Sequence, residues 1–332
     1  MTRISAHVDT YAIDRLPPPD LCPRLDLSGV PGLDYPERLN AAAELLDHWV
    51  AAGEGERIAL HHAGGPWTYQ RLFETANRIA RVLVEDCNLV PGGRVLLRGP
   101  NNPMLVACWF AVLKAGGIAV TTMPLLRERE LRDIISQAGV TFGLAEAKVA
   151  GDLEAALAET PGACVVRYGE DSGADGLEAR IAGKAPAFEN VSTGAEDPAI
   201  VAFTSGTTGR GKGTVHTHRD LLAVCDTYGR HVLQPVADDI FIGTPPVAFT
   251  YALGGLVLFP MRVGASTALV EQMSPPVLLE SIQEFRATVA FTSPTAYRAM
   301  VVPAGAFDLS GLRKGVSAGE ALPAATFEAW RK

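Results

Sequence analysis

The sequence predicts an α/β protein with two α/β subdomains, each built on a mainly parallel sheet flanked by helices. Short apolar runs alternate with segments of helical spacing along most of the chain, which is the pattern of parallel strands joined by helices. Residues 169–198 interrupt this pattern with a polar stretch rich in Gly, Ala and Asp. We therefore place the first subdomain, with an N-terminal arm, at residues 1–193 and the second at residues 194–332.

The first subdomain begins with a Pro-rich arm, residues 1–40, that we expect to wrap irregularly over a surface. Leu72, Ile79 and Leu83 recur at helical spacing, so the segment around them is predicted to be an amphipathic helix. Gly116 is a stop signal for the apolar helix before it. The expected helices are 41–51, 68–84, 103–116 and 128–138. The expected strands are 57–61, 94–98, 118–122 and 141–144.

The second subdomain is expected to begin with the apolar strand 199–204. Its other strands are predicted where short apolar runs are bounded by polar or turn-forming residues. These strands are 240–243, 266–269, 289–292 and 315–317. The helices expected between them are 218–232, 275–285 and 293–301.

The composition excludes several classes of protein. The chain has 332 residues, 48% of them hydrophobic, which is enough to bury a core. Its net charge of -8 argues against a nucleic-acid partner, because such a partner requires a basic surface. The longest apolar stretch, residues 104–113, is too short to span a bilayer, and the start does not resemble a signal peptide. The five cysteines are widely spaced and suit a reducing compartment, so we expect a cytoplasmic protein with no membrane partner.

The segment most informative about function is residues 199–218, AIVAFTSGTTGRGKGTVHTH. Glycines allow backbone N–H groups to converge on an anion, hydroxyl groups donate to phosphate oxygens, and a lysine adds positive charge. A strand that leads into all three together predicts a phosphate-binding loop rather than an ordinary surface turn. The predicted phosphate-binding residues are Thr204, Ser205, Gly206, Thr207, Thr208, Gly209 and Lys212.

A P-loop is an alternative interpretation of this segment. Gly206, Gly211 and Lys212 fit the G-x4-G-K spacing. A P-loop then requires Ser or Thr to hold magnesium, and this chain has Gly213. The P-loop interpretation is therefore weakened at its metal ligand.

TSGTTGRGKG, residues 204–213, resembles the signature loop of the adenylate-forming superfamily. This superfamily includes acyl-CoA synthetases, luciferases and the adenylation domains of nonribosomal peptide synthetases. The resemblance implies that the loop wraps the β- and γ-phosphates of ATP. Gly211 stands where the family commonly has proline, so we expect a more mobile loop.

Four further segments resemble the same superfamily and occur in its order along the chain. They are LKAGGIAVTTMPLL at 113–126, an aromatic segment at 244–266, FTSPTAY at 291–297 and GVSAGEALP at 315–323. The resemblance implies that the last segment lines adenine and the base of the acyl pocket. The residues so assigned are Ser317, Ala318, Gly319, Glu320 and Ala321.

The last segment also contains G-x-S-x-G, the nucleophile motif of α/β-hydrolases, centred on Ser317. That triad needs a histidine after the serine, and the last histidine of this chain is His231. An esterase is therefore disfavoured. His216 and His218 lack the cysteine or carboxylate partners of a zinc site, so we expect structural roles and no metal site.

The aromatic segment contains PP-x-AFT-x-x-LGG-x-x-x-FP, which resembles the benzoate and 2-aminobenzoate branch of CoA ligases. The resemblance implies that Phe249 gates the pantetheine tunnel beside the acyl pocket. A pocket for a small flat aryl acid needs apolar walls and few polar groups. The candidate substrate-binding residues are Phe249, Ala248, Tyr251, Gly254 and Tyr228.

The resemblance implies an aryl acid–CoA ligase, with ATP, Mg²⁺ and CoA as co-substrates and benzoate or 2-aminobenzoate as the acid. A ligase for another small carboxylic acid is an alternative, and a non-catalytic module that binds nucleotide or acyl-adenylate is an alternative of a different class. A homodimer is compatible with the resemblance.

The resemblance places the family's other catalytic parts after Lys332. These are a Tyr-Gly-x-Thr-Glu segment that binds phosphate and magnesium, a barrel part and a small lid domain. We therefore expect an incomplete large domain, with no complete catalytic set and little or no ligase turnover by these residues alone.

Overall fold

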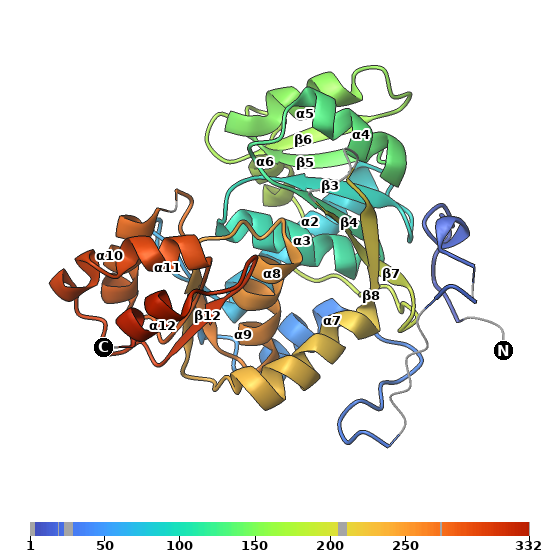
Figure 1. The fold of residues 1–332 in the computed structure, drawn as a ribbon. Helices are drawn as coiled ribbons and strands as arrows, with labels where there is room; N and C mark the ends of the chain where they lie inside the picture. Colours follow the sequence, from blue (N-terminus) through green and yellow to red (C-terminus); the bar gives the residue numbers. More distant parts are fainter. Residues whose placement is uncertain (1–3, 19, 23–28, 205–210, 273, 332) are drawn as a thin grey trace.

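The computed structural model describes residues 4–18, 20–22, 29–204, 211–272 and 274–331. The described residues form two six-stranded sheets, with helices between them and on both outer faces (Figure 1). The strand order is β6-β5-β3-β4-β7-β8 in the first sheet and β12-β11-β9-β10-β1-β2 in the second. This arrangement confirms the predicted α/β class.

The strands are short, and most neighbours are parallel. The first sheet contains β3 (Arg94–Arg98), β4 (Ile118–Thr122), β5 (Phe142–Glu146), β6 (Cys164–Tyr168), β7 (Pro198–Phe203) and β8 (Gly213–Thr217). The second contains β1 (Ile58–His61), β2 (Trp67–Thr68), β9 (Ile240–Gly243), β10 (Ser266–Ala268), β11 (Val289–Thr292) and β12 (Lys314–Ser317). Only the pairs β7–β8 and β1–β2 are antiparallel among the described strands.

The pairing of strands does not follow the predicted division of the chain after residue 193. β7 and β8 follow residue 193 in sequence, yet they complete the first sheet through the pair Ala119↔Ile200. β1 and β2 precede that residue, yet they join the second sheet through Leu60↔Thr267. Each sheet therefore draws strands from both sides of the predicted boundary, because long-range pairing rather than chain order decides membership.

The helices fill three layers around the sheets. Within the described chain they are α1 (His48–Ala51), α2 (Tyr69–Arg81), α3 (Pro103–Lys114), α4 (Glu128–Ala138), α5 (Ala150–Leu157), α6 (Leu177–Ala182), α7 (His218–Val224), α8 (Thr250–Leu253), α9 (Phe259–Arg262), α10 (Pro275–Phe285), α11 (Pro294–Met300) and α12 (Ala324–Trp330). Turns of π-helix extend several of them, at η2 (Ala43–Asp47), η3 (Val82–Asp86), η5 (Cys225–Leu233) and η6 (Gly254–Leu258). The sequence analysis did not predict β6, β8, α5, α6, α8 or α9.

Alternation along the strands divides the core into three clusters. Leu97 of β3 and Phe291 of β11 face the central cluster between the sheets, which α2 and α3 fill. Leu96, the neighbour of Leu97, faces α4 and α5 on the outer side of the first sheet. Ala290, the neighbour of Phe291, faces α10 on the outer side of the second. Successive strand residues point to opposite faces, so each sheet is buried on both sides.

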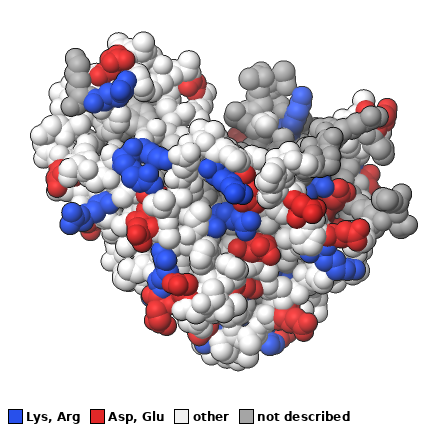
Figure 2. Space-filling model, turned by 90° about the horizontal axis from the view of Figure 1, so that it is seen from below, with Lys and Arg blue, Asp and Glu red and all other residues white. Residues whose placement is uncertain are grey.

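The surface seen in Figure 2 mixes lysine and arginine with aspartate and glutamate rather than gathering one sign of charge. Among the described residues, no helix combines the length and apolarity needed to cross a bilayer.

His218, the first residue of α7, is fully buried. Its Nδ1 accepts a hydrogen bond of 3.1 Å from the amide of Ala41, which joins α7 to the residues just before η2. Burial lowers the pKa of His218 from 6.5 to about 3, and this effect outweighs the attraction of Asp197. The folded protein therefore holds this side chain neutral.

The lowered pKa of His218 predicts acid sensitivity. Between pH 6.5 and 3 the unfolded chain binds a proton that the folded chain does not, so stability is full above this window and falls as pH drops through it. The expected loss is about 1.4 kcal/mol per pH unit. His218→Gln should reduce the slope of urea-unfolding free energy between pH 6.5 and 5. The exposed control His231→Gln should keep the wild-type slope.

Candidate functional site

The predicted phosphate loop connects β7 to β8 in a hairpin. The amide of Thr204 donates to the carbonyl of Lys212 at 3.0 Å, and the amide of Lys212 donates to Thr204 Oγ1 at 3.3 Å. A P-loop lysine would be followed by a helix, whereas Gly213 begins strand β8. The P-loop interpretation is therefore wrong. Five of the predicted phosphate-binding residues lie outside the described residues, namely Ser205, Gly206, Thr207, Thr208 and Gly209.

The geometry of this hairpin explains why residue 211 is glycine. A Cβ atom at this position would lie 2.7 Å from the carbonyl oxygen of Thr204, closer than real Cβ contacts allow. Glycine therefore lets the two sides of the loop base approach each other. The position at which the family commonly has proline is thus a position of close backbone contact in this chain.

An apolar cavity of about 520 Å³, here called the aryl cavity, lies beside the β7–β8 hairpin. Helical segments α7, η5, α8 and η6 form its walls, and the carboxyl ends of β11 and β12 close it. Five of the residues predicted for the site line it together: Tyr228, Tyr251, Gly254, Ser317 and Ala318. The sequence analysis did not assign its other walls, which include Ile200, His216, Asp220, Leu221, Thr250, Phe259 and Phe291.

Tyr251 fixes the end of the aryl cavity. Its hydroxyl lies 3.1 Å from the carbonyl oxygen of Thr292 and 3.0 Å from that of Val316, so it joins α8 to the ends of β11 and β12. The ring of Tyr251 also packs against Phe291, with centroids 5.5 Å apart. Burial raises the pKa of Tyr251 well above its usual value, so the phenol stays a neutral donor.

Ser317, at the end of β12, supplies a polar atom on this apolar wall. Its Oγ is buried and has no hydrogen-bond partner among the described residues. A buried hydroxyl without a partner is costly, which makes Ser317 a candidate contact for a bound group. Because no histidine of the described residues is hydrogen-bonded to Ser317 Oγ, the serine lacks the base that an α/β-hydrolase would need.

A smaller cavity of about 280 Å³, here called the gate cavity, lies on the other side of the loop base. Its lining includes Thr204 and Gly211 together with Ala248 and Phe249. Thr121 Oγ1 donates to the carbonyl of Ala248 at 2.9 Å and holds this turn against β4. The motif that contains Ala248, Phe249 and Tyr251 suggested that all three line one pocket. In the structure, Ala248 and Phe249 line the gate cavity, whereas Tyr251 lines the aryl cavity.

The chain direction at the start of α8 explains this separation. Phe249 is the extended N-cap residue of α8, whereas Thr250, the first helical residue, lines the aryl cavity. Consecutive side chains therefore face two cavities, and residues 249–250 form a wall between them.

The remaining predicted residues lie near these cavities without lining them. Gly319, Glu320 and Ala321 follow β12, where Gly319 takes a left-handed φ of 98° that favours glycine. Thr295 Oγ1 donates to Glu320 at 2.9 Å, which ties this turn to α11. Lys212 is exposed at the loop base. The ligand contacts expected of these residues stay predictions.

The profile of the AMP-binding enzyme family matches residues 46–332. This chain belongs to that family. The membership confirms the resemblance to adenylate-forming proteins, whereas the phosphate-binding role of the β7–β8 hairpin stays a prediction.

Several relatives of this chain are CoA ligases. Benzoate–CoA ligase of Thauera aromatica is 27% identical over 304 residues, which are 91% of this chain and 58% of that protein. Anthranilate–CoA ligase of Pseudomonas aeruginosa is 32% identical over 265 residues, or 78% and 49% of the two chains. The structure of an anthranilate–CoA ligase with anthranoyl-AMP superposes with a TM-score of 0.85 at 27% identity, covering 90% of this chain and 57% of that one. The chain thus spans about half the length of these relatives.

The aryl cavity is lined mainly by apolar residues, with Asp220 as a carboxylate on its wall. None of its lining residues is lysine or arginine, and most are aliphatic or aromatic. Tyr228 packs against Phe259 with ring centroids 5.6 Å apart and leaves part of its own ring exposed. The exposed part of the Tyr228 ring is therefore free to pack against a further aromatic group.

Proposed function

We propose that this protein activates a small aryl carboxylic acid with ATP and passes the acyl group to CoA, with 2-aminobenzoate or benzoate as the acid. The acid's carboxylate attacks the α-phosphate of ATP, which gives acyl-adenylate and pyrophosphate. The CoA thiol then attacks the acyl carbon, loses its proton and expels AMP. The observation that carries the proposal is the aryl cavity, which lies beside the β7–β8 hairpin in an AMP-binding enzyme. The names of the relatives, which specify benzoate and anthranilate, support the choice of acid.

The chain's own residues would bind and orient the reactants. Tyr228 and Tyr251 would hold the aryl ring, and the unpartnered Ser317 hydroxyl would meet a polar group of the acyl-adenylate. Thr204 and Lys212, at the base of the loop, would contact the phosphates as charge develops on them. Phe249 would separate this chamber from the gate cavity, through which the CoA thiol would approach.

The test is calorimetric titration of the chain with non-hydrolysable mimics of 2-aminobenzoyl-AMP, benzoyl-AMP and acetyl-AMP. We expect both aryl mimics to bind more tightly than the acetyl mimic. Tyr228→Ala should weaken aryl binding by about tenfold, since one aromatic contact contributes roughly 1 kcal/mol beyond its buried area. Acetyl binding should change less, and the exposed control Val302→Ala should match wild type.

Equal affinity for the acetyl mimic would contradict the aryl assignment and favour a ligase for another small acid. Absence of binding to folded protein would contradict the proposed site itself. Tight binding by a whole protein that forms no CoA thioester would favour the non-catalytic binding module.

A further inference from the structure

Residues 4–15, here called the strap, lie beside the β7–β8 hairpin at the edge of the first sheet (Figure 1). β8 is the last strand of that sheet and is only partly buried. An edge strand opens more readily than a central one unless another segment covers it. The contacts of the strap therefore bear on the order of the strand pair that carries the predicted phosphate loop.

The first anchor of the strap is at the start of β7. Asp197, which is fully buried just before β7, accepts hydrogen bonds through one carboxylate oxygen from the amides of Ala6 at 2.9 Å and Gly194 at 2.8 Å. The backbones fit closely there, because a Cβ atom at Gly194 would overlap the carbonyl oxygen of Ile4. The carbonyl of Asp197 in turn accepts from the amide of His218 at 3.2 Å. This anchor thus joins the strap to the start of α7, which forms one wall of the aryl cavity.

The second anchor of the strap is at the other end of the hairpin. Tyr11 and Ala12 line a small cavity of about 150 Å³ together with Phe203 and Gly213, which are paired where the predicted loop leaves β7 and returns to β8. Ala12 belongs to the apolar cluster outside the first sheet, which also contains Val201 of β7. The two anchors therefore lie at opposite ends of the hairpin, and the strap spans the strand pair.

Between and around the anchors, polar contacts hold the strap. The amide of Asp9 donates to the carbonyl of Pro91 at 2.9 Å, and its side chain forms an ion pair with Arg94 at the start of β3. The Tyr11 hydroxyl donates to the carbonyl of Gln137, near the end of α4, at 3.3 Å. Only one residue of the strap, at position 12, is buried. A segment with so little buried surface can open locally at a lower cost than global unfolding, so the strap is a detachable element.

We propose that docking of the strap orders the β7–β8 hairpin, and that strap docking and ligand binding in the aryl cavity favour each other. The first part stands on the contacts of the strap alone. The second part rests on the proposed function, because Ile200 and His216 of the hairpin line the aryl cavity. Coupling between two sites is reciprocal, so an acyl-adenylate should favour the docked strap by the same factor by which the docked strap tightens its binding.

The first test is hydrogen–deuterium exchange of the 332-residue chain without ligand. Gly194→Ala places a methyl group against Ile4, and Tyr11→Ala removes the ring at the other anchor without changing the hairpin itself. Each variant should speed exchange by about tenfold or more in strap peptides and by about fivefold or more in β8 peptides. Gly183→Ala, at the exposed end of α6 with no atom within 4 Å of the added Cβ, is the matched control and should exchange like wild type.

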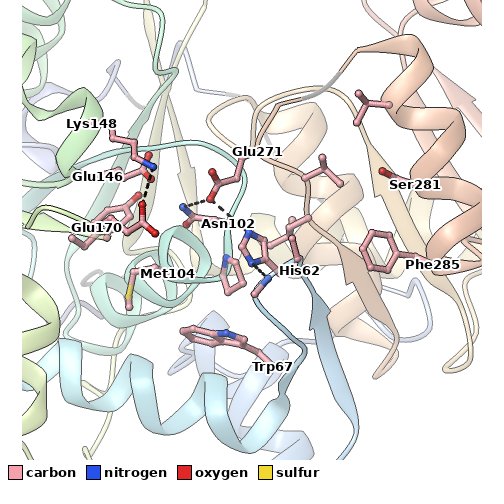
Figure 3. A pocket seen from close by; sticks show the side chains of 18 of the residues that line it. His62, Trp67, Asn102, Met104, Glu146, Lys148, Glu170, Glu271, Ser281 and Phe285 are labelled. Atoms are coloured by element: carbon pink, nitrogen blue, oxygen red, sulfur yellow. Dashed lines mark hydrogen bonds and ion pairs between the residues drawn. The ribbon is translucent and has the colours of Figure 1, made fainter.

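Strand β10 provides an internal reference in the second sheet. It ends beside a cavity of about 690 Å³ between the two sheets, where Figure 3 shows His62, Trp67 and Glu271. The residues that line this cavity belong neither to the strap nor to the hairpin, so exchange in β10 should stay at the wild-type rate. Unchanged exchange in β8 would overturn the proposal, because the strap would then be uncoupled from the hairpin. Equal acceleration in β10 would also overturn it, because the variants would then have lost stability in general.

The second test is calorimetric titration of the same variants with the benzoyl-AMP mimic. Gly194→Ala and Tyr11→Ala should weaken its binding by about fivefold or more, and the mimic should slow strap exchange in wild type by a similar factor. Gly183→Ala should bind like wild type. Equal binding by all three variants and wild type would overturn the coupling. Absence of binding to wild type would contradict the proposed function, whereas the exchange measured without ligand would still decide whether the strap orders the hairpin.

Discussion

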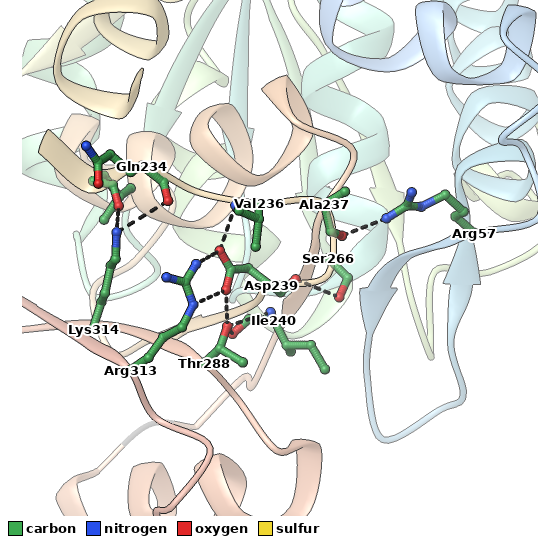
Figure 4. Close-up of polar contacts among 11 residues, drawn as sticks. Arg57, Gln234, Val236, Ala237, Asp239, Ile240, Ser266, Thr288, Arg313 and Lys314 are labelled. Carbon is green, nitrogen blue, oxygen red and sulfur yellow. Dashed lines mark hydrogen bonds and ion pairs between the residues drawn. The ribbon is translucent and has the colours of Figure 1, made fainter. Parts of the chain in front are cut away.

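Replacing Asp239 by alanine is expected to lower the free energy of unfolding by about 2–4 kcal/mol. Asp239 immediately precedes β9, and its side chain is 1% exposed. Figure 4 shows it at the centre of a network: it accepts from Arg313 Nε at 2.9 Å, from Thr288 Oγ1 at 2.6 Å and from the amide of Val236 at 2.8 Å. Alanine would remove the buried acceptor of these three hydrogen bonds, which is more costly than the loss of an exposed pair.

Asp238 provides a control at the adjacent position. Its side chain is 101% exposed and lies 4.0 Å from Arg57, so Asp238→Ala should leave the free energy of unfolding unchanged. Urea unfolding followed by circular dichroism measures both variants. Equal losses at the two positions would show that the buried network does not carry the effect.

The network around Asp239 also bears on the site. Arg313 precedes β12, which ends at Ser317 on the wall of the aryl cavity. A loosened β12 should displace that wall, so Asp239→Ala should also weaken binding of the benzoyl-AMP mimic. Asp238→Ala should not weaken it.

The local elements of this fold could be predicted because their signals are local. The apolar spacing of residues 128–138 and 275–285 gave α4 and α10 with the observed bounds, and the apolar runs 240–243 and 289–292 gave β9 and β11. β8 was not predicted as a strand. Its residues, Gly-Thr-Val-His-Thr, are polar and partly exposed, and their strand conformation depends on pairing with β7. That partner, and the membership of each sheet, are set by tertiary contacts.

In the candidate sites, too, some features have a local sequence signal and others depend on tertiary contacts. The motifs indicated Tyr251 and Ala318, and the helix after the phosphate loop indicated Tyr228; all three line one cavity although they come from separate segments. The motifs could not predict that Phe249 lines a different cavity from Tyr251, because this depends on helix α8 starting at Thr250.

Asp47→Ala is expected to destabilise the protein most, by about 3–5 kcal/mol, because it leaves a buried ammonium without its counter-ion. Lys114 ends α3 with a side chain that is 0% exposed, and its Nζ contacts Asp47 Oδ1 in η2. Asn190 completes the group, since its Nδ2 donates to Asp47 Oδ2 at 2.6 Å and its Oδ1 lies 3.3 Å from Lys114 Nζ. Burial lowers the pKa of Lys114, and Asp47 opposes this effect.

Glu44 is the matched control, because it lies in the same turn of π-helix and pairs with Arg262 at 3.6 Å near the surface. Glu44→Ala should cost little, as exposed pairs do. Denaturant midpoints of both variants give the comparison. A loss for Glu44→Ala that equals the loss for Asp47→Ala would assign the effect to the helix rather than to the buried charge.

A double replacement separates the charge from the packing. Asp47→Leu with Lys114→Met removes both charges and keeps apolar volume beside Phe73, whose ring lies 4.5 Å from Lys114 Nζ. Buried ion pairs replaced by apolar residues are often neutral, so the double variant should be more stable than Asp47→Ala although it carries more changes. If it were less stable than Asp47→Ala, the hydrogen bonds of Asn190 would contribute more than the buried charge costs. The connection between η2, α3 and the 183–193 segment would then depend on this polar group as a unit.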